Sequence, residues 1–439
     1  MAHISILDCP QEVQLQIVRF ACQSDLARLS LTCHALHNLT EPLIYSSVKF
    51  EWAREFHPPI TQLMQLLRTL LERQDLCPLI RHADFEGFGY RDELGSLHSD
   101  WTEEALDPPP VIPELPTDQL SAAIGKTGVS KAVVEQWFEK VQSGSPEASA
   151  APEHASEVGL PSFTSLKHVS LALLLHLNRH RHPSNTADAL ALFYLPNIET
   201  LSVSIDNPTS FTWPSSSPPK PISLKSLEIF RLRESRLAPV LSVATNLKKL
   251  KYNWMYCREV DDEVSKQSVM LGALSEALIE TKDSLEELEI IADTLPSPSC
   301  GEYEPPDVTF QGSISRLSEM HKLKTLYIPW TFLTGRKGLY TGPGLIGAAI
   351  PLNVEHLALD GFVTWSEDDC VEDTDELMVD GFAKELESGA LLHLKSLKSV
   401  CLPNSLFLAG LSEILENRMR ALEDRFGLAL SYDKGRDRD

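Results

Sequence analysis

Gly125, Lys126 and Thr127 stand in the order found at the end of a phosphate-binding loop. Such a loop cradles phosphates with backbone N–H groups, and it needs a second glycine five residues before Gly125 and a strand leading into it. The chain has Leu120 at that position, and no strand pattern precedes it. The run therefore predicts no nucleotide site.

Three histidines lie close together at His176, His180 and His182. No cysteine or carboxylate at ligand spacing completes a metal site, and Arg179 and Arg181 between them would repel a cation. The serine-hydrolase and zinc-protease motifs G-x-S-x-G and H-E-x-x-H are absent from the sequence as well. We therefore expect no catalytic residues, no metal and no cofactor, and a chain that is not an enzyme.

The strongest candidate group for binding a target is basic and aromatic. Its members are expected at outward positions on, or flanking, predicted strands: Arg231, Arg233, Lys249, Lys251, Trp254 and Tyr327. On a chain with a formal net charge of -23, such a group could contact an acidic or phosphorylated segment of a target. The alternative is that the two lysines only pair with Glu287 and Glu289 on the next strand.

A recurring pattern predicts the elements that carry this face: an apolar residue, two others, an apolar residue, one other, and an apolar residue. The matching triplets are Ile80/Ala83/Phe85, Leu166/Val169/Leu171, Ile198/Leu201/Val203, Leu227/Phe230/Leu232, Leu247/Leu250/Tyr252, Leu285/Leu288/Ile290, Leu323/Leu326/Ile328, Val354/Leu357/Leu359 and Leu397/Val400/Leu402. Helical stretches precede most of them, for example Leu271, Leu274 and Leu278. One strand and one helix per unit is the leucine-rich-repeat plan, and it predicts an α/β solenoid whose curved parallel sheet carries helices on its convex side.

Residues 5–48 predict a compact three-helix unit. Pro10 suits the first turn of the first helix, Ser24 is expected to cap the second, and the third is expected to end before Pro42. About 45 residues of this kind bury too little surface to be stable alone, so part of the apolar face is expected to meet a partner or the rest of the chain.

The same stretch has a closer likeness. The residues that carry it are Cys9-Pro10-Gln11-Glu12-Val13, Ile17, Ser24-Asp25-Leu26, Leu29, Leu31, Cys33, Leu36 and Glu41-Pro42-Leu43-Ile44-Tyr45. This set resembles the F-box of fungal F-box proteins, and the triplet region is similar to the repeat region of that family. Two positions differ, because the family usually has leucine at the place of Cys9 and often tryptophan at the place of Leu36.

The resemblance implies a function. In that family the F-box docks on a Skp-type adaptor, which links it to a cullin scaffold and a RING subunit, so that a bound target receives ubiquitin. The positions implied to face the adaptor or to hold the helices together are Pro10, Val13, Ile17, Leu26, Leu29 and Leu36. The chain is thus expected to be a substrate-recognition subunit for an unknown target protein. The alternative is a leucine-rich-repeat scaffold whose F-box-like helices are only a cap and serve no ligase.

The sequence divides into five predicted segments: an F-box (1–48), a linker with a first repeat-like unit (49–90), an insertion rich in proline and serine (91–160), a leucine-rich-repeat-like domain (161–430) and a charged tail (431–439). One amphipathic helix is expected in the insertion, with its apolar face formed by Val134, Trp137, Phe138 and Val141. That helix is expected either to pack on the repeats or to bind a second partner.

Composition limits the partners. The 439 residues are 43% hydrophobic, which is enough for a large core, and 62 acidic residues outnumber 39 basic ones. That charge repels phosphate backbones and anionic lipid, so we expect no nucleic-acid and no membrane partner. The eight cysteines contain no C-x-x-C pair and read as reduced thiols, most of them in the core. With no signal-peptide pattern, the predicted location is the cytoplasm, the nucleus or both.

Overall fold

The structure is a computed structural model of the chain. It describes residues 6–52, 60–87, 163–173, 189–205, 207, 209–215, 217–256, 258, 263–294, 306–336, 346–360, 374–403 and 413–432. The predicted insertion at 91–160, with its amphipathic helix and the Gly125 run, lies outside the described residues, and so do His176, His180 and His182. The chain divides into two compact units: unit 1 is Met1–Leu175 with Ala191–Glu199, and unit 2 is His176–Leu190 with Thr200–Asp439.

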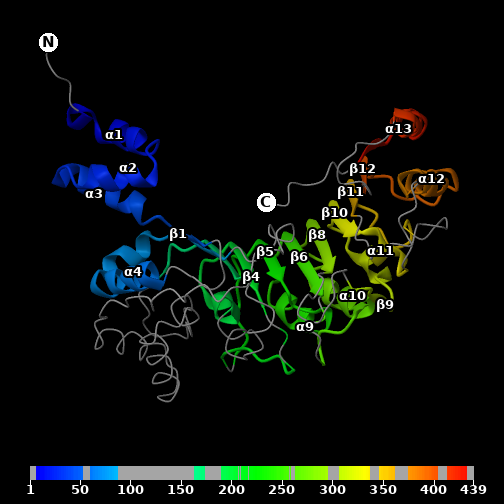
Figure 1. The fold of residues 1–439 in the computed structure, drawn as a ribbon, viewed down its shortest axis with the longest axis horizontal. Coiled ribbons are helices and arrows are strands. Elements are labelled where there is room, and N and C mark those ends of the chain that lie inside the picture. The colour runs from blue at the N-terminus through cyan, green and yellow to red at the C-terminus, as the bar shows by residue number, and fades with distance from the viewer. Residues whose placement is uncertain are drawn as a thin grey trace, which may run out of the picture. The chain divides into compact units, whose positions relative to one another are not determined.

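Unit 1 combines helices with parallel strands (Figure 1). Its elements are η1 (Ile6–Asp8), α1 (Gln11–Val18), α2 (Gln23–Ser30), α3 (His34–Ile44), β1 (Ser47–Trp52), α4 (Ile60–Glu72), η2 (Gln74–Leu79), β2 (His82–Gly87), β3 (His168–Leu173) and η4 (Leu192–Tyr194). The register places His82 of β2 opposite Ser47 of β1 on one side and His168 of β3 on the other. Strand β1 is an addition to the predicted elements, and it crosses the predicted boundary at residue 48.

Helices α1 to α3 form a small bundle around one core. The buried residues of that core are Val18, Leu26, Leu36 and Leu39, and Leu29 packs partly buried against them. These side chains recur at helical spacing, which is how three short helices can share one apolar centre. The prediction of three helices in this stretch is confirmed.

Two helix ends differ from the prediction. Cys22, not Ser24, is the N-cap residue of α2. Helix α3 continues past Pro42, although the sequence predicts that it ends before this residue. Proline removes one backbone hydrogen bond from a helix, but the next turn still forms, because the N–H of Tyr45 bonds to the Glu41 carbonyl at 3.1 Å.

Unit 2 alternates short strands with helices. Its elements are β4 (Thr200–Ser204), β5 (Ser226–Phe230), α9 (Glu234–Leu241), β6 (Lys249–Tyr256), β7 (Ser268–Met270), α10 (Leu271–Ile279), β8 (Glu287–Thr294), β9 (Thr309–Gln311), η7 (Ser315–Glu319), β10 (Thr325–Pro329), α11 (Trp330–Thr334), β11 (His356–Asp360), α12 (Thr374–Glu387), β12 (Ser399–Leu402), α13 (Glu413–Phe426) and β13 (Ala429–Tyr432). Figure 1 shows α9, α10 and α11 on one side of strands β5 to β10.

One large parallel sheet contains every described strand except β7 and β9. It has 11 strands in the order β1-β2-β3-β4-β5-β6-β8-β10-β11-β12-β13. Strands β7 and β9 form a separate parallel pair. Parallel neighbours need a crossover connection, and helices such as α9 between β5 and β6 and α12 between β11 and β12 form part of these connections. The predicted α/β class with a parallel sheet is therefore confirmed.

Within unit 2 the strands align their inward residues in rows. One row consists of Leu201, Leu227, Leu250, Leu288, Leu326, Leu357, Val400 and Leu430. All of its members from Leu201 to Val400 are buried. Because each strand covers the apolar side chains of its neighbours, every added strand extends the core along the sheet.

Hydrogen bonds repeat with the same step. The backbone N–H of Lys248 bonds to the Lys225 carbonyl at 2.7 Å, that of Glu286 to Lys248 at 2.9 Å, and that of Lys324 to Glu286 at 2.8 Å. An asparagine side chain just before a strand also donates to a carbonyl of the preceding unit, and this bond joins Asn197 to Thr164, Asn246 to Ile222 and Asn353 to His321. The residues just before successive strands therefore form the same hydrogen bonds, although the segments between the strands differ in length.

Each predicted triplet coincides with a strand, and one triplet has the wrong frame. The register of β5 pairs Leu227 with Leu250, so that Ile229, and not Phe230, is the next inward residue. Leu232 follows the strand. The observed triplet is Leu224/Leu227/Ile229. The segment matches the apolar pattern in two overlapping frames, and pairing with β4 and β6 selects one of them.

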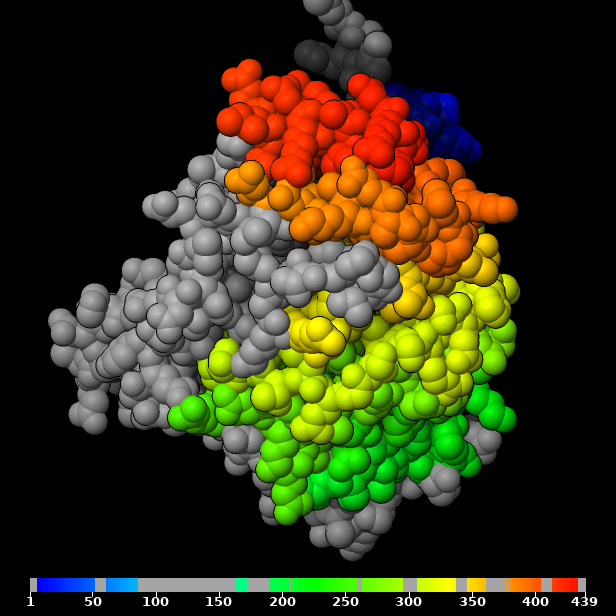
Figure 2. Space-filling model, turned by 90° about the vertical axis from the view of Figure 1, so that its right-hand side faces the viewer, coloured from blue at the N-terminus to red at the C-terminus, as the bar shows by residue number. Residues whose placement is uncertain are grey.

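Helices α12 and α13 lie side by side at one end of unit 2 (Figure 2). Arg425 Nη1 of α13 lies 2.7 Å from Glu387 Oε1 of α12, and Arg418 forms a second ion pair with Asp380. Strand β13 follows α13 and extends to Tyr432, past the predicted domain boundary at residue 430. Within the described ranges, every helix is too short or too polar to cross a bilayer.

Candidate interaction surfaces

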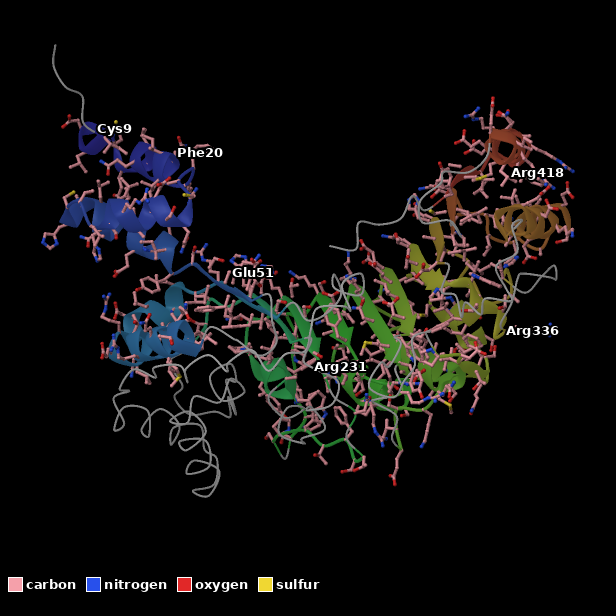
Figure 3. The ribbon with its side chains drawn as sticks, in the orientation of Figure 1. Cys9, Phe20, Glu51, Arg231, Arg336 and Arg418 are labelled. Carbon is pink, nitrogen blue, oxygen red and sulfur yellow. The ribbon has the colours of Figure 1, made fainter. Side chains whose placement is uncertain are left out.

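Three large apolar side chains are exposed along one side of α1. Val13 and Ile17 are 40% and 46% exposed, and Phe20, which follows the helix, is 93% exposed. Phe20 is labelled in Figure 3. Residues at this spacing share one helix face, and we refer to Val13, Ile17 and Phe20 as the apolar stripe. Leu31, which follows α2, is 86% exposed. Grouped apolar side chains of this size are typical of a surface that binds another protein.

The residues predicted to meet an adaptor divide between this surface and the core beneath it. At the surface are Pro10, Val13 and Ile17. In or against the core are Leu26, Leu29 and Leu36. Phe20 also lies at this surface, although it is not among the residues predicted to meet an adaptor. Its helical spacing from Val13 and Ile17 is visible in the sequence and indicates the same helix face.

Charged residues on the outward positions of β5, β6 and β8 pair across the strands. Lys249 Nζ lies 3.2 Å from Glu287 Oε2, as the pairing alternative predicts. Lys251 Nζ lies 2.7 Å from Glu228 Oε1 on β5, whereas the alternative predicts Glu289 on β8. Glu228 also accepts hydrogen bonds from two neighbouring side chains, Ser202 at 2.8 Å and Asn253 at 3.2 Å. Both lysines are therefore already matched by carboxylates.

Arg233 and Glu234 form a buried ion pair where α9 begins. Arg233 Nε lies 3.0 Å from Glu234 Oε2, and both side chains are 1% exposed. Glu234 Oε1 accepts the indole N–H of Trp254 at 2.7 Å and the backbone N–H of Met270 at 3.0 Å. The Arg233 guanidinium donates to the Ser268 carbonyl at 2.6 Å and stacks over the Trp254 ring, 4.7 Å from its centroid. The pair thus joins α9 to β6 and β7.

This network is structural, because no target can reach it. Burying two charges costs free energy, and only a full set of hydrogen bonds such as this one offsets that cost. Tyr252 lies in the same region, where its hydroxyl donates to the Leu232 carbonyl at 2.7 Å, and burial raises its pKa. The predictions that Arg233 and Trp254 lie on the binding face are therefore wrong. The outward position predicted for Arg233 rests on the wrong frame of β5. Trp254 belongs to the inward side of β6, on which Leu250, Tyr252 and Tyr256 are also buried.

Arg231 is half-buried at the end of β5 (Figure 3). Its φ is 70°, the one positive value among described residues other than glycine. This left-handed backbone is costly for a residue with a Cβ, and it is stabilised by hydrogen bonds from its N–H to the Asn253 carbonyl at 3.3 Å and from Asn207 Nδ2 to its own carbonyl at 2.9 Å. Tyr327 is in register with Glu289 but is only 9% exposed. The predicted target residues that remain accessible are Arg231, Lys249 and Lys251.

A row of charges runs along the residues that precede the strands. Glu286 lies between two lysines, 2.8 Å from Lys248 Nζ and 3.0 Å from Lys324 Nζ. Hydrogen bonds from Lys248 and then Lys324 lower the pKa of Glu286 to about 2. Glu355 forms a similar pair with Lys398, which lowers its pKa as well. These ion pairs link neighbouring strands at the end of the sheet where the strands begin.

The described residues offer no arrangement for metal chemistry. Within them, no group of three or more histidine, cysteine, aspartate or glutamate side chains is placed to hold a metal ion. The described cysteines are free thiols. Cys77 is buried, which raises its pKa to about 11, but Cys22 and Cys33 are exposed, against the expectation of core positions.

Comparison with known proteins leaves the family open. No model of a known protein family matches the chain, and no curated protein matches it. Function is therefore inferred from the surfaces described above.

Proposed function

We propose that this protein is the substrate-recognition subunit of a Skp-cullin-F-box type ubiquitin ligase. Helices α1 to α3 serve as the F-box and dock on a Skp-type adaptor, and through it on the cullin and RING subunits. The strand-and-helix units serve as a leucine-rich-repeat-like domain that binds a target protein. The chain itself is a receptor and catalyses no step of ubiquitin transfer.

The apolar stripe is the observation that carries the proposal. Val13, Ile17 and Phe20 are exposed beside a helical core with four buried apolar residues, Val18, Leu26, Leu36 and Leu39. Each large apolar side chain that a partner buries stabilises the complex by about 1.5–3 kcal/mol. The stripe is therefore a ready source of docking free energy, and it lies in the segment whose sequence resembles an F-box.

The polar outward face of the strands in unit 2 supports the second part of the proposal. In one register row Ser202, Glu228, Lys251 and Glu289 stand on consecutive strands of the sheet. Parallel strands lie about 4.8 Å apart, so such rows form a continuous surface of side chains. Surfaces of this kind, presented by a rigid stack of units, suit recognition of another protein. The paired lysines favour a target that forms hydrogen bonds across the face over one that needs free cations.

The direct test is binding to the Skp-type adaptor, measured by calorimetry. Wild-type protein is compared with an Ile17→Asp/Phe20→Asp double variant, because both side chains are at the surface and their loss leaves the helical core intact. We expect affinity to fall at least about a hundredfold, since two apolar anchors are replaced by charges. Leu392→Asp is the matched control: Leu392 is 74% exposed in unit 2, and its replacement is expected to leave adaptor binding unchanged.

Either outcome decides between two readings. Tight binding that the double variant loses, with the variant still folded by circular dichroism, supports the ligase subunit. If folded wild-type protein does not bind the adaptor, the proposal fails, and the chain is then a repeat scaffold capped by three helices.

A further inference from the structure

Two histidines lie side by side on the outward face of unit 1. His82 of β2 and His168 of β3 are in register, their ring centroids are 4.5 Å apart, and their planes differ by 4°. Within the described part of the chain, neither imidazole hydrogen bonds to another protein group. His82 is exposed and His168 is half-buried, so their ring nitrogens are available to a ligand.

The charged groups around this pair are of both signs, with a small excess of carboxylates. Lys167 Nζ lies 2.6 Å from Glu199 Oε1, and Lys49 pairs with Glu51 on β1. The other charged residues on or directly before these strands are Arg81, Asp84 and Glu86. Carboxylates therefore outnumber the cationic side chains by one, so the imidazoles must carry protons before an anion is attracted here. A proton taken up here creates a positive spot on a chain whose net charge of -23 otherwise repels anions.

The stacked geometry favours an anion over a metal ion as the ligand. A metal ion bound by both rings has to lie in the plane of each, which two nearly parallel, stacked rings do not allow. Two imidazolium groups at this distance repel each other, so the second proton is unfavourable on its own. An anion that accepts N–H hydrogen bonds from both rings removes that repulsion.

We propose that His82 and His168 form a binding site for an anionic group, a carboxylate or a phosphate, which they hold through imidazole N–H donors when the pair is protonated. The inference deepens the proposed function, on which it rests only in assigning the anion to a target protein. The anion is an acidic or phosphorylated side chain of that target, bound on the face of β2 and β3. The two lysines on β6 that the sequence favoured for this role, Lys249 and Lys251, are already paired with carboxylates.

The site couples anion binding to proton uptake. Burial, and then the neighbouring His82, lower the pKa of His168 below its usual value. A bound anion favours the charged form and raises that pKa again. Binding therefore strengthens as pH falls through the histidine range, by about tenfold per pH unit where one proton is taken up.

The test follows histidine carbon resonances of the full-length protein labelled at the ring Cε1, with inorganic phosphate and acetate as probes at constant ionic strength. At about pH 6, where imidazoles titrate, we expect phosphate or acetate to shift the His82 and His168 signals saturably, and much less at about pH 8. His82→Gln is expected to abolish the response of His168, and His168→Gln that of His82. Phosphate acting well below the acetate concentration identifies a phosphorylated target group, and equal action identifies a carboxylate.

A third histidine provides the control. His356 occupies the corresponding outward position on β11, but its neighbour is Ser399, which lies 2.8 Å from His356 Nδ1. The His356 signal and a His356→Gln variant are expected to report no anion site. The inference is overturned if chloride moves the His82 and His168 signals as much as phosphate does, or if His168 responds equally in His82→Gln. Adaptor binding by the His82→Gln/His168→Gln variant is expected to equal wild type, so this failure is separate from failure of the ligase proposal.

Discussion

The helical bundle of unit 1 exposes large apolar side chains, whereas the repeating units of unit 2 bury charged ones. Phe20 after α1 is 93% exposed, and Arg233 before α9 is 1% exposed. Each is the reverse of what side-chain polarity alone predicts. The cause differs between the two regions: the bundle is too small to cover its apolar residues, and the stacked units are deep enough to enclose an ion pair with all its hydrogen bonds.

Contacts within the fold account for one of these two unusual positions and not for the other. In unit 2, burial of Arg233 and Glu234 is explained by contacts within the fold, so their unusual position indicates stability and not recognition. In the bundle, contacts within the fold do not explain the exposed stripe, so a partner is the better explanation. An exposed apolar group and a buried polar group are both informative, but they point to different roles.

Removing one half of the buried pair is expected to have the largest effect. Glu234→Ala leaves the Arg233 guanidinium uncompensated in the core and is expected to lower the free energy of unfolding by about 3–5 kcal/mol. The shift of the urea midpoint measures it. Glu287→Ala, which removes the exposed partner of Lys249, is the control and is expected to cost less than about 1 kcal/mol. Similar losses for both variants would mean that the buried pair is no stronger than a surface one.

The corrected frame of β5 gives the next largest effect. Ile229 is completely buried and Phe230 is on the outward side, so Ile229→Ala is expected to cost about 2–5 kcal/mol. Phe230→Ala is expected to cost clearly less, although its side chain is larger. The two urea midpoints decide the frame, and a greater loss for Phe230→Ala would restore the frame that the sequence pattern first suggested.

The same strand shows how far sequence reasoning reaches. The triplet pattern predicts where strands lie because burial of alternate residues is a local property, and β4, β6, β8, β10 and β11 follow it residue by residue. In β5 two frames match equally well, and only hydrogen bonding to neighbouring strands separates them. That information is not contained in the segment itself.

The candidate sites were harder to predict for the same reason. Helical spacing identifies Val13 and Ile17 as one apolar face, but it cannot tell which apolar residues of the bundle lie inward, and Leu26 proved to be core. The pairing of Lys249 with Glu287 is predictable from the sequence, because adjacent strands place these opposite charges next to each other. The stacking of His82 on His168 depends on pairing between strands that are far apart in the sequence, so the local sequence around either histidine does not predict it.

The charge row before the strands is expected to respond to acid. Hydrogen bonds from Lys248 and Lys324 lower the pKa of Glu286 to about 2, from a usual value of 4.5. A carboxylate with a lowered pKa stabilises the fold fully above its usual pKa and loses that contribution as pH falls through its folded value. Wild-type protein is therefore expected to lose more stability than Glu286→Gln between about pH 5 and pH 2. Thermal melts across this range measure the difference.

Exposed Glu280, at the end of α10, provides the control for this experiment. Glu280→Gln is expected to follow the wild-type pH profile, because the variant keeps the contacts of Glu286 with both lysines. If Glu286→Gln and wild type lose stability in parallel, the lysine contacts at this position do not contribute to folding.

The smallest expected effect tests the apolar stripe. Phe20→Ser removes a side chain that is 93% exposed, and we expect the free energy of unfolding to change by no more than about 0.5 kcal/mol. Leu26→Ala in the core beneath is expected to cost about 2–5 kcal/mol in the same urea titration. A loss of the core size for Phe20→Ser would mean that the chain itself covers this residue in solution, as expected if the helices only cap the repeats. A negligible loss leaves the stripe free for a partner, which is the condition that adaptor docking requires.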